Sequence, residues 1–282
     1  MGFIDKILNP FGKNKNTTKK YKDISKESQR VAPDTPSELL LFCRDIAGNQ
    51  IQEKISQSDD LHWIRAEYTY PSFDSMNFMY KNLIFSVIID IQDKYGKSYL
   101  PEIFIKRQLY ACKTYNLIPC KYPIIVPNPT EPEPDKIKPK TQGWNLFNTE
   151  TDKEIIPEDF NTNDLIELSD WEMRNFGIRF ISRYLSAKKI KLLSFQDTLE
   201  VDPQIWFEDE NGKKCWIIVR CEHTEEIKKP KKLNEIIRRC FKYDGYFAGI
   251  IIEPKNKDIK TLYRCQDIRI TFNGLEKIHS TI

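Results

Sequence analysis

A small set of oxygen-bearing side chains stands where a strand could support metal-dependent chemistry. Asp90 and Gln92 follow the apolar run 85–89, and residues two apart on a strand point to the same face. Asp74 lies upstream, before another strand-like segment. Carboxylates can hold a hard cation such as Mg²⁺, which acidifies a bound water and neutralises charge that develops on a phosphodiester. Metal-assisted hydrolysis is therefore the chemistry that these residue types bring into consideration.

The same pattern recurs further along the chain. Asp202 precedes a strand-like segment, and the apolar run 215–219 ends in Arg220. A repeat of this length is a whole small domain, so we expect two related modules, each with its own core. Four residue pairs share a separation of 128: Asp74 with Asp202, Phe78 with Trp206, Cys112 with Cys240, and Tyr115 with Tyr243.

Hydrophobic patterning predicts the same order of elements in both halves, α-β-β-β-α-β. Thr35 and Glu38 form a capping-box pattern for a helix that ends near Gly48 or somewhat later. Ser169 and Glu172 repeat that pattern in the second half. The order predicts an α/β fold of the α+β kind, in which helices pack on a mixed sheet.

Composition divides the chain into four predicted segments. Residues 1–34 are expected to form a flexible basic tail with an amphipathic head, and residues 35–126 the first module. Residues 127–142 are predicted to be a linker, because five prolines among charges favour stiff, extended chain over packed structure. Residues 143–282 complete the second module.

The predicted order of elements has an Asp on the second strand and a polar pair at the end of the third. This arrangement resembles the restriction-endonuclease-like superfamily, whose core motif is PD-(D/E)XK. The resemblance implies that Asp74 and Asp90 bind Mg²⁺, that Glu67 adds a carboxylate, and that Asp74, Asp90 and Gln92 form the catalytic set. The first half departs from the motif at Gln92, which stands where the family has Lys.

The second half departs further from the motif. Asp202-Pro203 reverses the usual Pro-Asp order, Ile218 stands at the acidic position, and Arg220 could replace the Lys. Glu222 lies on the same face but is displaced. The resemblance therefore implies that the second module does not bind metal in the family's manner.

These departures favour a non-catalytic binding or regulatory protein built on degenerate nuclease-like modules, without a cofactor. Two alternatives remain: a Mg²⁺-dependent nuclease that uses the first module, and a tandem chaperone-like module that binds a protein segment. Strand order separates the nuclease-like fold from the chaperone-like one, because the former places the Asp-bearing strand beside the strand that ends in (D/E)XK.

The charge distribution constrains the partner. Residues 1–30 carry eight Lys or Arg against three acidic residues, a net +5, so residues 31–282 of a chain with net charge +3 have a net charge of −2. This disfavours duplex DNA, whose binding requires neutralised phosphates. We expect another protein as the partner and keep nucleic acid as a second class. The apolar and basic residues within 3–22 predict a peripheral membrane contact.

Composition also indicates a bacterial cytoplasmic protein. No stretch approaches the roughly 20 apolar residues of a membrane span, and the first residues do not form a secretory signal. The seven cysteines form no CxxC pair, which predicts buried free thiols rather than a zinc site or a disulfide framework. No P-loop or HExxH motif occurs, and with three histidines and no obvious base near a nucleophile, hydrolases of the triad type are disfavoured.

Deletion of residues 1–30 should leave both modules folded, because this segment offers little apolar area to bury. The melting temperature of the shortened chain, followed by circular dichroism, is expected to stay within about 2 °C of that of the full chain. An insoluble or collapsed product would contradict this expectation.

Overall fold

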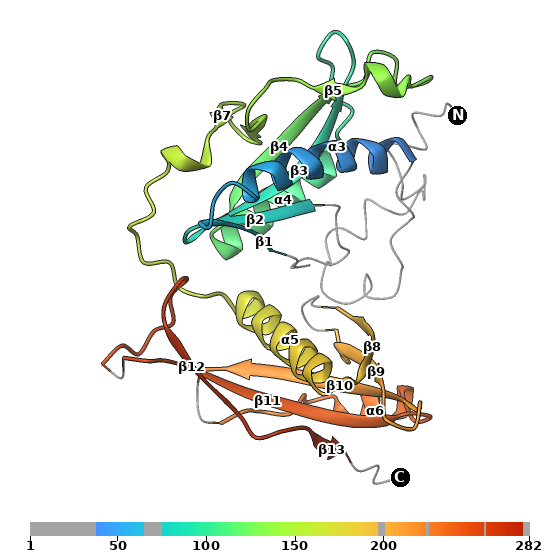
Figure 1. Cartoon of the computed structure of the whole chain (residues 1–282), viewed down its shortest axis with the longest axis vertical. Helices are drawn as coiled ribbons and strands as arrows, with labels where there is room; N and C mark the ends of the chain where they lie inside the picture. The colour runs from blue at the N-terminus through green and yellow to red at the C-terminus, as the bar shows by residue number, and fades with distance from the viewer. Residues whose placement is uncertain (1–37, 65–74, 197–200, 224–225, 257, 279–282) are drawn as a thin grey trace. The chain divides into compact units, whose positions relative to one another are not determined.

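The computed structural model describes residues 38–64, 75–196, 201–223, 226–256 and 258–278 (Figure 1). The predicted tail, Thr35, Glu67 and Asp74 lie outside these ranges. The chain divides into two compact units, with the boundary between residues 164 and 165. The described residues form a mixed α/β protein with two mixed sheets and four α-helices, which confirms the predicted fold class at this level.

The first unit contains the predicted α-β-β-β-α-β order and continues with three short strands. Its sheet has the order β1-β2-β3-β4-β6-β7, and β5 also pairs with β4. β1 pairs antiparallel with β2 and β2 with β3, whereas β3 and β4 are parallel. The elements are α3 (Glu38–Ile55), β1 (Leu61–Ile64), β2 (Ser75–Tyr80), β3 (Leu83–Gln92), α4 (Glu102–Tyr115), β4 (Ile118–Ile125), β5 (Lys138–Pro139), β6 (Leu146–Asn148) and β7 (Glu154–Ile155).

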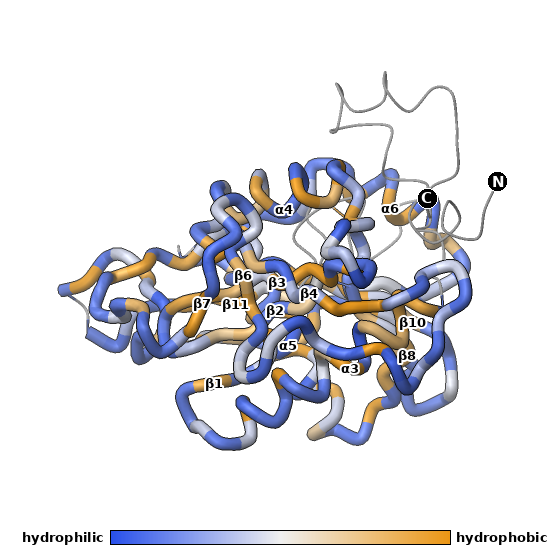
Figure 2. The backbone as a smooth tube through the Cα atoms, turned by 90° about the horizontal axis from the view of Figure 1, so that it is seen from above, coloured by the Kyte–Doolittle hydropathy of each residue, from blue (hydrophilic) through white to orange (hydrophobic). Residues whose placement is uncertain are grey.

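The two helices of the first unit cover opposite faces of the sheet (Figure 1). α3 buries every fourth residue, Leu39, Cys43, Ala47 and Ile51, against the odd-numbered positions of β3. α4 lies on the other face. Nine of the ten residues of β3 are consequently buried, so the strand is enclosed on both sides. Figure 2 shows the hydropathy of the residues along the backbone.

The predicted linker 127–142 is wrong, because this segment packs onto the first unit. β5 pairs with the end of β4, and Ile137 is buried in the core. Trp144 stacks on Phe78, with ring centroids 5.5 Å apart. Scattered apolar residues provide enough burial to hold the segment, and an edge strand such as β5 tolerates Pro139. Residues 143–164, assigned to the second module from sequence, also belong to the first unit.

The second unit repeats the element order of the first. Its sheet has the order β12-β11-β10-β9-β8, and β13 also pairs with β11. The pairings of β8 with β9 and of β9 with β10 are antiparallel, and β10 is parallel to β11. The elements are α5 (Asp170–Ala187), β8 (Lys191–Phe195), β9 (Ile205–Glu208), β10 (Lys214–Glu222), α6 (Leu233–Arg239), β11 (Asp244–Pro254), β12 (Ile268–Phe272) and β13 (Glu276–Ile278).

The helix start predicted at Ser169 is confirmed and is reinforced by a distant residue. Glu172 Oε2 accepts hydrogen bonds from Ser169 N (3.0 Å) and Ser169 Oγ (2.6 Å). Arg264 also donates to this carboxylate, through Nε to Oε1 (2.7 Å) and Nη2 to Oε2 (3.1 Å). The pair is almost fully buried, so it ties the segment after β11 to the first turn of α5.

Among the described residues, every helix is too short or too polar to cross a membrane.

The two helices of the second unit cover opposite faces of its sheet. α5 packs on the odd-numbered positions of β10, whereas α6 packs on Trp216 and Ile218 of the opposite face. Trp216 is paired in register with Gly245 of β11, and a Cβ atom added at Gly245 would lie 2.2 Å from the Trp216 ring. The indole therefore occupies the space over this glycine.

Gly245→Ala should destabilise the second unit by about 2 kcal/mol, because the new methyl group overpacks the buried Trp216 ring. The matched control is Gly48→Ala in α3, where nothing lies within 4 Å of the added Cβ. That change is expected to stabilise the helix by about 0.5 kcal/mol. Urea denaturation followed by tryptophan fluorescence measures both, and equal effects of the two substitutions would contradict this packing argument.

Candidate functional site

Asp90 is held by neutral donors at the end of β3. It lies on the face opposite α3 and is fully buried. Its Oδ1 accepts a hydrogen bond from Ser98 Oγ (2.5 Å), and its Oδ2 accepts one from Gln92 Nε2 (2.6 Å). Ser98 reaches the carboxylate because the turn after β3 folds back, with Tyr99 N donating to Ile91 O at 2.9 Å. Both carboxylate oxygens thus have the partners that a buried carboxylate requires.

Gln92 is the other predicted site residue that the structure describes. It is 5% exposed and lies beside Asp90, as the spacing of two residues predicted. Its Oε1 atom is buried and has no hydrogen-bond partner among the described residues. Amide and carboxylate oxygens are ligands that hard cations accept, so this pair retains one feature of the predicted metal site.

The convergence of Asp74 and Glu67 on Asp90 stays a prediction, because both residues lie outside the described ranges. β2 begins immediately after Asp74, and its first residue pairs with Ile88 of β3. Within the described part of the chain, no group of three or more His, Cys, Asp or Glu side chains is placed to hold a metal ion.

Gln108 is a buried polar residue that sequence patterning did not single out. It lies on α4 and is fully buried, and its Nε2 donates to the carbonyl oxygens of Ser86 (2.6 Å) and Cys120 (2.8 Å). Its Oε1 accepts from Thr149 Oγ1 (2.8 Å). The residue therefore fastens α4 to the two parallel strands. Its position four residues before Cys112, on the inward face of the helix, was the available signal.

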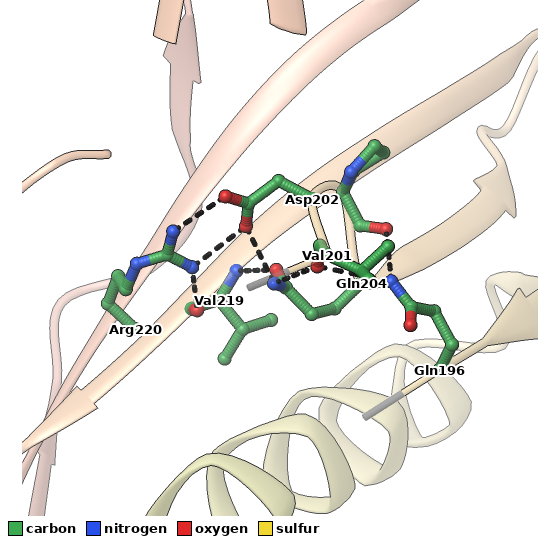
Figure 3. Close-up of polar contacts among 7 residues, drawn as sticks. Gln196, Val201, Asp202, Gln204, Val219 and Arg220 are labelled. Carbon is green, nitrogen blue, oxygen red and sulfur yellow. Dashed lines mark hydrogen bonds and ion pairs between the residues drawn. The ribbon is translucent and has the colours of Figure 1, made fainter. Parts of the chain in front are cut away.

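The corresponding region of the second unit contains an ion pair, where the first unit has a carboxylate held by neutral donors (Figure 3). Arg220 donates through Nη1 to Asp202 Oδ1 (2.9 Å) and through Nη2 to Asp202 Oδ2 (2.8 Å). The two side chains are 17% and 12% exposed. This two-pronged geometry is the strong form of the Arg–carboxylate interaction. Arg220, expected from sequence as a substitute for a catalytic Lys, here neutralises Asp202.

Gln204 completes this network from a fully buried position. Its Nε2 donates to Asp202 Oδ1 (2.6 Å) and Val201 O (2.7 Å), and its Oε1 accepts from Val219 N (2.9 Å). Gln196 Nε2 donates to Val201 O at 3.1 Å, so a second amide supports the same segment (Figure 3). Sequence reasoning missed both glutamines. Both carboxylate oxygens of Asp202 thus accept hydrogen bonds from within the second unit.

The register of the parallel strands changes which residues correspond in the two units. Asp90 pairs with Pro123, whereas the residue 128 positions after Pro123, Ile251, pairs with Glu222. Glu222 is therefore the counterpart of Asp90 in this register, and Ile218 is not. The turn before β10 has five residues, 209–213, where the first unit has two, 81–82, and this difference accounts for three of the four positions of the shift.

The cysteines are structural in this arrangement. Six of the seven are buried, as predicted, and Cys265 is exposed. Burial raises the pKa of Cys43, Cys112 and Cys221 to about 12 and that of Cys120 well above its ordinary value. A thiol with a raised pKa is a poor nucleophile at neutral pH, because the thiolate is the reactive form.

Residues 171–278 match the model of a family described as a domain of unknown function (DUF8840). The matched range begins inside α5 and ends with β13, so it corresponds to the second unit. No curated protein and no solved structure matches the chain.

Arg220→Gln should lower the free energy of unfolding by about 2 kcal/mol, because the Asp202 carboxylate would lose its cationic partner while staying largely buried. The loss is smaller than that for a fully buried ion pair, because both side chains are partly exposed. Lys191→Gln is the matched control, since it breaks the exposed pair with Glu208 and should cost about 0.5 kcal/mol. Guanidinium denaturation in parallel distinguishes the two, and a loss for Arg220→Gln no larger than for the control would refute the assigned role.

Proposed function

We propose that this chain is a non-catalytic binding protein, in which two nuclease-like frames have lost the acidic metal site. The observation that carries the proposal is the Asp202–Arg220 pair. The Asp202 carboxylate accepts two hydrogen bonds from one guanidinium and a third from Gln204 on Oδ1, so three of its roughly four acceptor sites are already used within the protein. Arg220 would also repel a divalent cation at this position.

The first unit supports the same proposal by different means. Asp90 has no exposed surface, and Ser98 and Gln92 each occupy one of its oxygens. For Mg²⁺ to reach this carboxylate, the side chains packed around Asp90 would have to open, because no part of the residue is exposed. An enclosed carboxylate of this kind is better explained as structural polar packing than as a preorganised catalytic centre.

The nuclease-like frame is favoured over the chaperone-like alternative by strand order. β2 lies between β1 and β3, and β9 lies between β8 and β10, so the strand that follows the predicted Asp borders the central strand in both units. Helices on both faces of a mixed sheet are also consistent with this frame.

One observation favours the alternative of a Mg²⁺-dependent nuclease. Gln92 Oε1 is a buried acceptor without a partner among the described residues, and it lies next to Asp90. Asp74, together with Glu67, would supply the remaining oxygen ligands. In that case Asp90→Ala would abolish metal-dependent cleavage and leave the protein folded.

Titration calorimetry with MgCl₂ tests the proposal on the full chain. The wild type should show no saturable binding at millimolar metal, and Asp90→Asn, which keeps the size of the side chain, should give the same trace. The exposed Asp59→Asn provides a control of equal charge change. Saturable binding that is lost in Asp90→Asn and kept in Asp59→Asn would establish the metal site and replace the proposal with the nuclease alternative.

A further inference from the structure

Positive charge on this chain is concentrated in two segments. Residues 228–242 contain seven Lys or Arg and one acidic residue, a net +6, and residues 1–30 have a net +5. Because the whole chain is +3, the remaining 237 residues have a net charge of −8. The concentration is therefore local, and the second segment lies within the described part of the second unit, around α6 (Figure 1). We refer to residues 228–242 as the α6 basic face.

The cations of the α6 basic face are mostly not neutralised by the protein. Lys229 pairs with Glu276, and Lys228 lies 3.9 Å from Glu226. The other five basic residues are exposed and form no ion pair with any residue that the structure describes: Lys231, Lys232, Arg238, Arg239 and Lys242. Leaving so many like charges close together destabilises a monomer slightly, which points to an anionic partner.

The local fold holds this face outward. α6 buries Ile236 and Ile237 against Trp216 and Ile218, so Arg238 and Arg239 are left on the outer side of the helix. Phe241 follows the helix and is 70% exposed, although it is a large apolar side chain. Lys242 Nζ lies 5.7 Å from the centre of its ring. An exposed phenyl ring with a lysine beside it, on a segment rich in basic residues, is the combination that lipid interfaces accept.

We propose that the α6 basic face docks on the surface of an anionic lipid bilayer, with the basic side chains at the headgroups and Phe241 inserted. Clusters of four to eight Lys or Arg on an amphipathic element fit anionic headgroups by charge complementarity. Single-stranded nucleic acid is the weaker fit, because it needs several free rings for stacking. Phe241 is free, but the Tyr243 ring packs edge-on against Trp206 with centroids 5.4 Å apart.

The charge of residues 1–30 gives an independent reason for choosing a lipid surface. A single weak anchor binds membranes only marginally, and stable attachment requires two signals. The sequence of residues 3–22 combines apolar and basic residues, and the α6 basic face is a second such combination on the same chain. The inference holds whether or not either unit binds metal.

Cosedimentation of the full chain with vesicles tests the proposal. Vesicles of phosphatidylcholine with phosphatidylserine should bind the protein, and binding should weaken with salt. The variant with Lys231, Lys232, Arg238 and Arg239 all changed to Gln should partition at least about tenfold less, since each basic residue contributes about fivefold. Phe241→Ala should reduce partition by about fivefold.

The control removes four exposed lysines from the first unit, with the same change in net charge: Lys94, Lys113, Lys138 and Lys153 changed to Gln. The proposal expects this variant to bind as the wild type does, with both variants keeping the wild-type melting temperature. Equal losses in the two quadruple variants would overturn it, because binding would then follow net charge alone. Undiminished vesicle binding of the α6 variant, or a loss confined to binding of an oligothymidylate probe, would also overturn it.

Discussion

Each unit depends on a central strand that is buried on both faces. β3 and β10 lie between an antiparallel and a parallel neighbour and are covered by one helix on each side. The parallel neighbour requires a crossover, and the helix in that crossover covers the second face. Burial on both sides excludes water along the strand, so any polar side chain near its end must find its partners within the protein.

The two units meet this requirement differently. In the first unit, the carboxylate of Asp90 accepts hydrogen bonds from a hydroxyl and an amide. In the second unit, Arg220 neutralises Asp202, and Gln204 links the pair to the backbone of β10. Both arrangements use the carboxylate to hold adjacent segments together. The proposal of a binding function rests on this internal use of the acidic groups.

The surface has a different organisation from that of the interior. Asp90 and Asp202 make their hydrogen bonds within their own units, whereas most cations of the second unit's α6 basic face are exposed and form no ion pair with a residue that the structure describes. Helix α6 can carry this charge because its two buried isoleucines anchor it on Trp216 and Ile218. Structural and interaction roles are thus divided between the two sides of one short helix.

The sequence by itself determined the fold class, the α-β-β-β-α-β order, the capping of α5 at Ser169 and the burial of six cysteines, because these follow from local periodicity and side-chain chemistry. It also placed Gln92 beside Asp90, through the two-residue period of a strand. Only tertiary structure decided that the proline-rich segment belongs to the first unit, that Arg220 pairs with Asp202 and that Glu222 corresponds to Asp90. These features depend on contacts between distant segments and on turn length, which sets strand register and is invisible to a local pattern.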